Sequence, residues 1–393
     1  MKYMPSQIQH IMTEFIEGYG LSKFMEMVFN CLMKLERKDF LRLSNDPSNK
    51  ANGYRFGSAI GFGKSLRLEI PRDRLGNFYP ILLTLIRNQE EELANLAFNL
   101  YSKGLSVRDV SDIFDNIYGK HYSKSSISRM NQEFIEEVEE WRNRPLQKHY
   151  PILVIDALHS NIRRDHSVEM EATYTIMAVQ EDMSRDIISI EHMPIESSSG
   201  WEEVLQKLKD RGVKSAGLII ADGLTGLENS IPKVFPAAKF QKCVVHFKRN
   251  ILRKVRSKHK KEIGTDLKYI FSVTDPNFTY NDAKARFKIF VDKWGKSYKF
   301  IKNLTNSIST EYYFTYLRFD YRIRSMIYTT NWVENLNKQY RKVLKIRNSM
   351  PTEESVLLLL GKVAMDKVYK YRNYPIYKFK FDKYLFPQKD TNV

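Results

Sequence analysis

The chain has 393 residues, of which 42% are hydrophobic, so it is long enough for two or three globular domains and extensive disorder is not expected. Lysine and arginine total 63 against 46 acidic residues, and the formal net charge of +17 favours a polyanionic partner, although solubility alone would also explain it. No apolar stretch approaches the roughly 20 residues that cross a bilayer, the N-terminus lacks a secretory pattern, and there are only two cysteines. We therefore expect a cytoplasmic protein without membrane spans or a disulfide framework.

The chain opens with a segment of helical pattern and continues with a basic, irregular one. Residues 1 to 43 carry apolar side chains at helical spacing. Residues 44 to 80 are richer in Asn, Gly and Pro, which predicts an irregular segment with room for β-structure. This segment contains Arg72 and Arg74, which are candidates for contacts with DNA phosphates.

A helix-turn-helix candidate lies at about 104–134. Ser106 is suited to cap a first helix with apolar residues at helical spacing, Gly119 falls in the turn, and Ser123 is suited to cap a second helix. The outer face of that second helix carries Lys124 and Arg129, which suit phosphates and base edges. An ordinary helical hairpin fits the same pattern, and the local sequence leaves both open.

From residue 150 the pattern becomes that of a mixed α/β sheet. One short apolar run ends in Asp156 and another ends in Asp222, as expected where buried strands end. Further strands are predicted near 171–180, 186–194 and 240–245, a helix at about 200–211, mainly helical structure over 262–325, and a last helix from about 331.

Two groups of basic residues in this half of the chain are candidates for binding the DNA backbone. The first begins at Lys248, continues to Lys261, and includes Arg249 and Arg253. The second follows Glu334 at helical spacing and comprises Lys338, Arg341 and Lys345.

Asp156 and Asp222 need an explanation, because burying a lone carboxylate costs several kcal/mol unless it is paired, hydrogen-bonded or bound to a metal. Either one alone is more simply explained as a helix or turn cap, and Asp222-Gly223 is a good turn dipeptide. Together, on adjacent strands, they could hold a divalent ion, and their hard oxygen ligands suit Mg²⁺ or Mn²⁺.

A two-metal phosphoryl-transfer site takes a third acid, and Glu334 is the candidate. The local alternative is strong, since Asn331 with Glu334 makes a capping box and Glu334 with Lys338 makes an ordinary surface pair. Cys243 and His246 form half of a zinc site at best, so structural zinc is not expected.

Several motifs occur in a fixed order between about residues 36 and 350. The longest comprises Asp222-Gly223-Leu224-Thr225-Gly226-Leu227, Phe235-Pro236 and Gln241-Lys242-Cys243-Val244-Val245-His246-Phe247-Lys248-Arg249-Asn250. Others are Asn52-Gly53-Tyr54, Asp156-Ala157 and Thr330-Asn331 followed by Glu334-Asn335-Leu336-Asn337. Together they resemble the Mutator-like family of bacterial insertion-sequence transposases.

The resemblance implies an α/β fold, namely an RNase H-like mixed-sheet catalytic domain interrupted by an all-helical insertion and preceded by a mainly helical DNA-binding region. Carried over residue by residue, the family's DDE triad falls on Asp156, Asp222 and Glu334. The Cys243 and His246 pair belongs to the family pattern and is expected to support the catalytic core. The implied domains are 1–149 for DNA binding, 150–249 with 326–393 for catalysis, and 250–325 for the insertion.

The resemblance also implies a DNA transposase that binds the terminal inverted repeats of an insertion sequence and catalyses metal-dependent strand cleavage and strand transfer. Its expected partners are double-stranded DNA at the element ends and at the target, and two Mg²⁺ or Mn²⁺ ions. Because an element has two ends, we expect a homodimer or a larger assembly. Two alternatives remain, a domesticated DNA-binding regulator without catalysis and an RNase H-like nuclease or resolvase.

Overall fold

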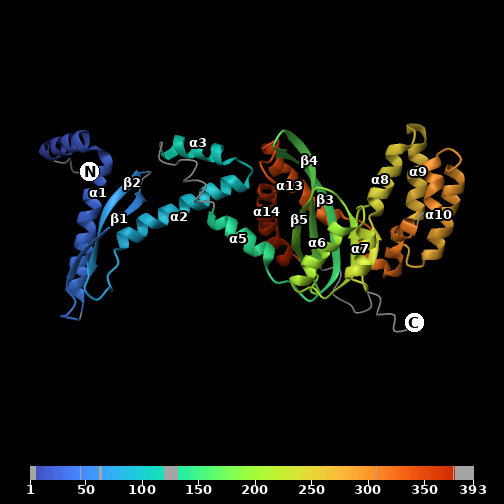
Figure 1. Ribbon diagram of the computed structural model, residues 1–393, viewed down its shortest axis with the longest axis horizontal. Coiled ribbons are helices and arrows are strands. Elements are labelled where there is room, and N and C mark those ends of the chain that lie inside the picture. Colours follow the sequence, from blue (N-terminus) through green and yellow to red (C-terminus); the bar gives the residue numbers. More distant parts are fainter. Residues whose placement is uncertain are drawn as a thin grey trace. The chain divides into compact units, whose positions relative to one another are not determined.

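The computed structural model describes residues 6–44, 46–61, 64–118, 132–306, 308–374 and 376. The chain forms two compact units, Met1–Phe134 and Ile135–Val393 (Figure 1). The sequence analysis placed this division at 149/150. The difference arises because the helix α5 (Gln132–Asn143) packs closely on the last helix of the second unit, where Gly361 lies against Val138. No helix in the described ranges is long and apolar enough to cross a membrane.

The first unit is built from three helices and a β-hairpin in its described residues. Helix α1 (Ser6–Leu43) is kinked at Gly20 and is followed by the antiparallel strands β1 (Ala51–Gly61) and β2 (Lys64–Asp73) and by α2 (Ile81–Ser102). Glu26 and Asn30 of α1 accept hydrogen bonds from backbone N–H groups of β2, at 2.7 and 2.8 Å. The predicted helical start and β-structure are therefore confirmed.

The first half of the helix-turn-helix candidate is the helix α3 (Val107–Tyr118). Its start is a reciprocal cap, in which Ser106 Oγ accepts from Asp109 N at 3.1 Å and Asp109 Oδ2 accepts from Ser106 N at 2.8 Å. The predicted turn and second helix, with Gly119, Ser123, Lys124 and Arg129, lie outside the described residues.

The second unit is organised around a mixed five-stranded sheet of order β5-β4-β3-β6-β7. Its strands are β3 (His149–Arg164), β4 (Ser167–Val179), β5 (Arg185–Met193), β6 (Ser215–Ala221) and β7 (Lys239–Lys242). The first three pair antiparallel, whereas β6 is parallel to both β3 and β7. This confirms the predicted mixed α/β sheet. The last strand is shorter than predicted, because α8 (Val244–Lys254) begins two residues after Lys242.

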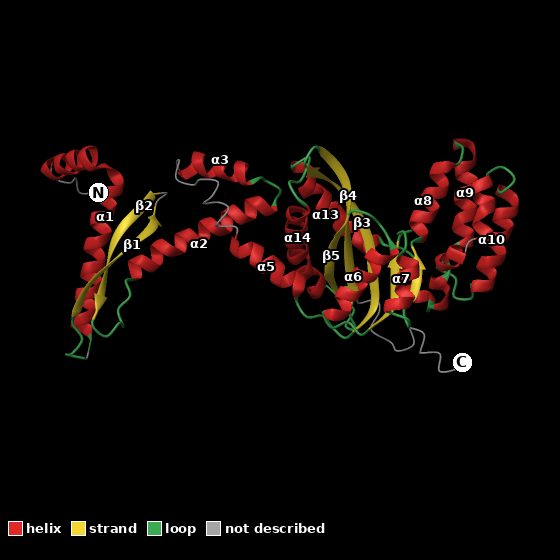
Figure 2. Cartoon of the chain, in the orientation of Figure 1, coloured by secondary structure: helices red, strands yellow, loops and turns green. Residues whose placement is uncertain are grey.

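Helices cover both faces of this sheet (Figure 2). On one face, α6 (Ser198–Asp210) and α7 (Leu227–Val234) bury side chains such as Trp201 and Ile231 against the strands. On the other face, α13 (Asn331–Ile346) and α14 (Glu353–Asn373) contribute Leu336 and Leu360 to a second core. The first half of the central strand β3, as far as Asp156, is therefore buried on both sides, which makes this carboxylate conspicuous.

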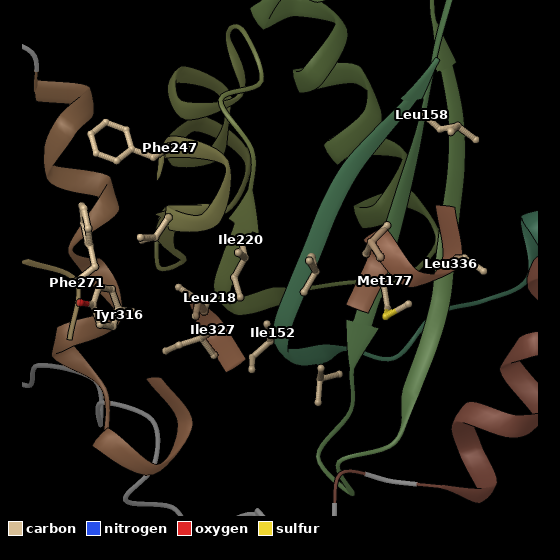
Figure 3. Packing of buried hydrophobic residues seen from close by; sticks show 14 of the residues in the cluster. Ile152, Leu158, Met177, Leu218, Ile220, Phe247, Phe271, Tyr316, Ile327 and Leu336 are labelled. Atoms are coloured by element: carbon tan, nitrogen blue, oxygen red, sulfur yellow. The ribbon is translucent and has the colours of Figure 1, made fainter. Parts of the chain in front are cut away.

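Between α8 and α13 the described residues form a segment of helices joined by short turns, as predicted. It comprises α9 (Ser257–Ile270), α10 (Tyr280–Trp294), α11 (Lys299–Lys302), α12 (Tyr321–Ile327) and the 3-10 helices at Asn303–Asn306, Ile308–Tyr313 and Thr315–Arg318. Phe271 and Tyr316 of this segment belong to the same buried cluster as Ile152 and Leu218 of the sheet (Figure 3). Sheet and helical segment thus share one continuous core.

Candidate active site

Two of the predicted acids are brought together by the parallel pairing of β3 and β6. The last residues in register between these strands are Ile155 and Ala221, so Asp156 and Asp222 follow at equivalent places. Asp156 does not end its strand, contrary to the prediction, because β4 continues to pair with β3 as far as Arg164. It lies instead just beyond the point where the pairing of β6 with β3 ends, and it lines a cavity there.

The third acid, Glu334, reaches the same place from the first turns of α13. All three carboxylates line one cavity of about 340 Å³. The alternative roles considered for Glu334 are not seen, since the residue before α13 is Thr330 and no side chain caps the helix. Lys338 donates to Asn335 Oδ1 at 3.3 Å rather than to Glu334. Glu334 is therefore directed into the cavity and is not used as a helix cap.

Asp156 is the most deeply buried of the three acids, with 7% of its surface exposed. Burial raises its pKa to about 6, and the nearby Glu334 and Asp222 carboxylates add to this effect. Its Oδ2 accepts a hydrogen bond of 2.8 Å from Nδ2 of Asn337, a fully buried residue one turn after Glu334 on α13. The same helix therefore supplies one carboxylate and orients another.

The positive charges paired with the acids come from α8. His246 Nδ1 lies 3.5 Å from Asp222 Oδ2, and its Nε2 lies 3.5 Å from Glu334 Oε1. A hydrogen bond with the Cys243 side chain and the charges of the neighbouring acids raise the pKa of His246 to about 9. One turn later, Arg249 pairs with Glu334 at 3.3 Å. The Cys243 and His246 motif thus places a protonated imidazole between two predicted catalytic acids.

The donor chemistry of the cavity fits a hard divalent cation, because three carboxylates converge there. Across the described ranges, however, no three His, Cys, Asp or Glu side chains are grouped closely enough to hold a metal ion. The ring of His246 stands between Asp222 and Glu334 and supplies the positive charge that the acids need. A cation at this place would have to take over those contacts from the imidazole.

A fourth carboxylate, Glu196, also lines the cavity and was missed by the sequence analysis. Its Oε2 accepts from Thr225 N at 2.9 Å, and its Oε1 accepts from the Tyr174 hydroxyl at 2.8 Å. It therefore fastens the loop that follows Asp222. Glu196 lies in a loop between a strand and a helix, without a local pattern that would mark it, so only the tertiary structure reveals it.

The predicted DNA-binding residues lie in several different places. Arg249, Lys338 and Arg341 line the carboxylate cavity, and Lys345 lines a neighbouring cavity that also includes Arg341. Arg253 is exposed on α8, and Arg72 and Arg74 are exposed in the first unit. Lys248 is different, because its ammonium lies 5.3 Å from the ring centre of Phe271 and 5.8 Å from that of Tyr328. Burial lowers the pKa of Lys248 to about 8.

Comparison with known proteins places this arrangement in a family. The model of the Mutator family of transposases matches residues 6–373. The chain is 30% identical over 352 residues to the transposase of insertion sequence element IS1201 of Lactobacillus helveticus, covering 88% of this chain and 94% of that protein. It is also 30% identical over 391 residues to the transposase of IS256 in transposon Tn4001 of Staphylococcus aureus, covering 96% and 97%. The chain therefore belongs to the Mutator family of transposases.

Proposed function

We propose that this protein is an insertion-sequence transposase, which cuts DNA at the ends of its element and joins those ends to a target. The observation that carries the proposal is the convergence of Asp156, Asp222 and Glu334 on one cavity. The relatives bear the names of insertion-sequence transposases, which agrees with it. The order of the sheet, with three antiparallel strands followed by two parallel ones, supports an RNase H-like arrangement of this catalytic core.

Asp156, Asp222 and Glu334 are the residues that would hold Mg²⁺ or Mn²⁺. Bound there, two such ions would supply the positive charge that activates an attacking hydroxyl and stabilises the leaving oxygen. Asn337 keeps the carboxylate of Asp156 oriented toward the cavity through its 2.8 Å hydrogen bond. His246 and Arg249 balance the acids while the cavity holds no cation, which limits their mutual repulsion.

The reaction proposed is a pair of in-line phosphoryl transfers. In the first, water attacks the phosphodiester at the element end, and the bond to the 3′ oxygen breaks to leave a free 3′-hydroxyl. In the second, that hydroxyl attacks a target phosphodiester, so one bond forms as another breaks and no external energy source is needed. Arg341 and Lys338 at the rim of the cavity hold the DNA backbone during both steps.

The partners follow from this reaction. Double-stranded DNA is bound at the terminal inverted repeats and at the target site, with the segment around α3 and the exposed Arg72 and Arg74 of the first unit as candidates for recognising the repeats. Because both ends of an element must be processed together, a homodimer or a larger assembly is the proposed working form.

The test is a strand-transfer assay on a labelled duplex that carries the inverted repeat flanking the gene, with Mg²⁺ or Mn²⁺. We expect Asp222→Ala to abolish cleavage and transfer. Asp292→Ala, which removes an exposed acid of α10 outside the cavity, should leave both intact. Undiminished activity of Asp222→Ala would refute the proposed site. Specific binding without cleavage in either metal would identify a regulator, and cleavage of branched DNA irrespective of end sequence would identify a resolvase.

A further inference from the structure

A second cavity, of about 290 Å³, opens beside the carboxylate cavity. The two share His159 of β3 and Arg341 of α13, so they adjoin each other. Its other walls come from the strand after His159, from α13, and from the turn that follows α13. Among the described residues that line it there is no carboxylate, in contrast to the first cavity. Its charge comes from Arg341 and Lys345.

The walls of this cavity are fixed by hydrogen bonds between segments far apart in the sequence. Met350 N donates to Asn161 O at 2.8 Å, and Arg163 N donates to Met350 O at 2.9 Å. The turn after α13 thus forms an isolated parallel bridge with β3 at Ile162. Asn161 Nδ2 donates to the Asn348 carbonyl at 3.2 Å. Asn348 adopts a left-handed conformation, with φ of 55°, which L-residues rarely adopt and which asparagine tolerates best. The cavity is thus part of the fold and does not depend on a loose loop.

Three polar side chains that line this cavity, Ser160, Arg341 and Lys345, suit a negatively charged ligand that accepts hydrogen bonds. Only 8% of the surface of Ser160 is exposed, and its Oγ has no hydrogen-bond partner among the described residues. An unpartnered buried hydroxyl is unfavourable unless a ligand or water completes it. Arg341 and Lys345 lie four residues apart on α13, where like charges repel each other unless an anion lies between or above them.

We propose that this second cavity is a subsite for a backbone phosphate of the DNA strand that enters the active site. The proposal rests on the proposed function, which supplies a DNA strand in the neighbouring cavity. Lys345 and Arg341 contact the charge of the phosphate, and Ser160 Oγ donates a hydrogen bond to one of its oxygens. The adjoining carboxylate cavity, where the scissile bond would lie, favours a phosphate within a strand over a free anion.

The geometry of α13 sets the distance of this subsite from the scissile bond. At about 1.5 Å per helical residue, Arg341 lies about 10 Å and Lys345 about 16 Å along the axis from Glu334. One strand of B-form DNA advances about 3.4 Å per nucleotide. The subsite therefore receives a phosphate about three to five nucleotides from the cleavage position, and the strand follows α13 toward Met350.

The decisive measurement is the salt dependence of DNA binding, followed by fluorescence anisotropy on the flanking-repeat duplex without divalent metal. Lys345→Ala should weaken binding and make the slope of log K against log salt shallower by about 0.9, because one counterion fewer is released. Ser160→Ala should weaken binding about tenfold with an unchanged slope, because a hydroxyl carries no charge. The matched control is Lys342→Ala, which removes the same charge from an exposed position of the same helix that lines neither cavity.

A second measurement keeps the test independent of how well Ser160→Ala folds. Duplexes with one neutral methylphosphonate at successive positions should bind wild-type protein more weakly at a position about three to five nucleotides from the cleavage position, in addition to positions contacted by other basic residues. The Lys345→Ala protein should show no further loss at that place. The subsite is refuted if Lys345→Ala binds like wild type, if Lys342→Ala loses as much, or if no methylphosphonate about three to five nucleotides from the cleavage position weakens binding. If the subsite is refuted, metal-dependent cleavage that is lost in Asp222→Ala would still support the proposed function. If DNA binding shows the expected losses but the protein does not cleave DNA, the subsite is supported and the proposed catalytic function is not.

Discussion

The loop after Asp222 contains two glycines that the sequence motif does not distinguish, and the structure predicts different consequences for replacing them. Gly226 has a φ of +85°, and a Cβ there would lie 2.5 Å from Ser198 N and 2.9 Å from Ser197 C. Gly223 lacks a positive φ, and its Cβ would meet nothing within 4 Å. We therefore expect Gly226→Ala to destabilise the second unit and Gly223→Ala to leave its stability nearly unchanged.

The magnitude follows from three contributions at Gly226. A left-handed conformation costs an alanine roughly 1–2 kcal/mol. The contact with the Ser198 backbone forces α6 and α7 apart, and overpacking of this kind costs about 1–3 kcal/mol. The lower entropy of the unfolded alanine chain offsets about 0.4–1 kcal/mol. The net loss should be about 2–3 kcal/mol, against less than about 0.5 kcal/mol for Gly223→Ala.

The assay is urea unfolding of the whole chain followed by tryptophan fluorescence. The four tryptophans of the chain are Trp141, Trp201, Trp294 and Trp332, so the signal reports only on the second unit. A parallel thermal scan should show a Tm lower by about 5–10 °C for Gly226→Ala. If the two alanine variants unfold within about 0.5 kcal/mol of each other, the close approach of Gly226 to α6 does not determine the stability of this loop.

Two further predictions concern Asn337 and Lys248. Asn337→Leu removes the donor to Asp156, so cleavage should fall about ten- to a hundredfold. The acid limb of the pH profile of cleavage should move to higher pH, because the pKa of Asp156 rises further when the hydrogen bond to its carboxylate is lost. The tryptophan unfolding curve of the variant is the control for folding, and an unchanged pH profile would contradict this role of Asn337. Lys248 has a folded pKa of about 8 against an ordinary value of 10.5, so the unfolded state binds more protons between these values and stability rises with pH there. Urea unfolding should therefore show that Lys248→Met is more stable than wild type by about 1–2 kcal/mol at pH 7, a figure reduced to allow for solvent screening of the partly exposed ammonium. This difference in stability should shrink as the pH rises from about 8 toward 10.5. A difference that does not change with pH would refute the lowered pKa of Lys248.

Residues whose role is set by the strand pattern were the most predictable. The apolar runs before Asp156 and Asp222 identified two buried strands, and parallel pairing then places the following acids side by side whatever the rest of the fold. The extent of β3 was not predictable in the same way. Its continuation to Arg164 depends on hairpin pairing with residues of β4 before the predicted start of that strand near 171, and on the long-range bridge to Met350.

Residues whose role depends on the side of a helix were harder to assign. The basic run after Phe247 was interpreted as a surface for DNA. Lys248, however, follows a buried phenylalanine and lies four residues from the buried Val244, so the helix turns it toward aromatic rings. Glu334 shows the reverse case, since its local sequence favours a helix cap. Only the packing of α13 on the sheet, through Val333 and Leu336, directs its carboxylate into the cavity.

Helix α13 explains why acid and basic chemistry can lie so close together in one molecule. Glu334 and Asn337 face Asp156, whereas Arg341 and Lys345 continue along the same helix into the cavity without carboxylates. Because α13 is one continuous helix anchored on the core by the buried Leu336 and Tyr340, its geometry sets the distance between the acid site and the basic subsite. A phosphate held at the far end of the helix would therefore place another phosphate of the same strand among the acids. That coupling of position to chemistry makes substrate alignment a property of this single helix.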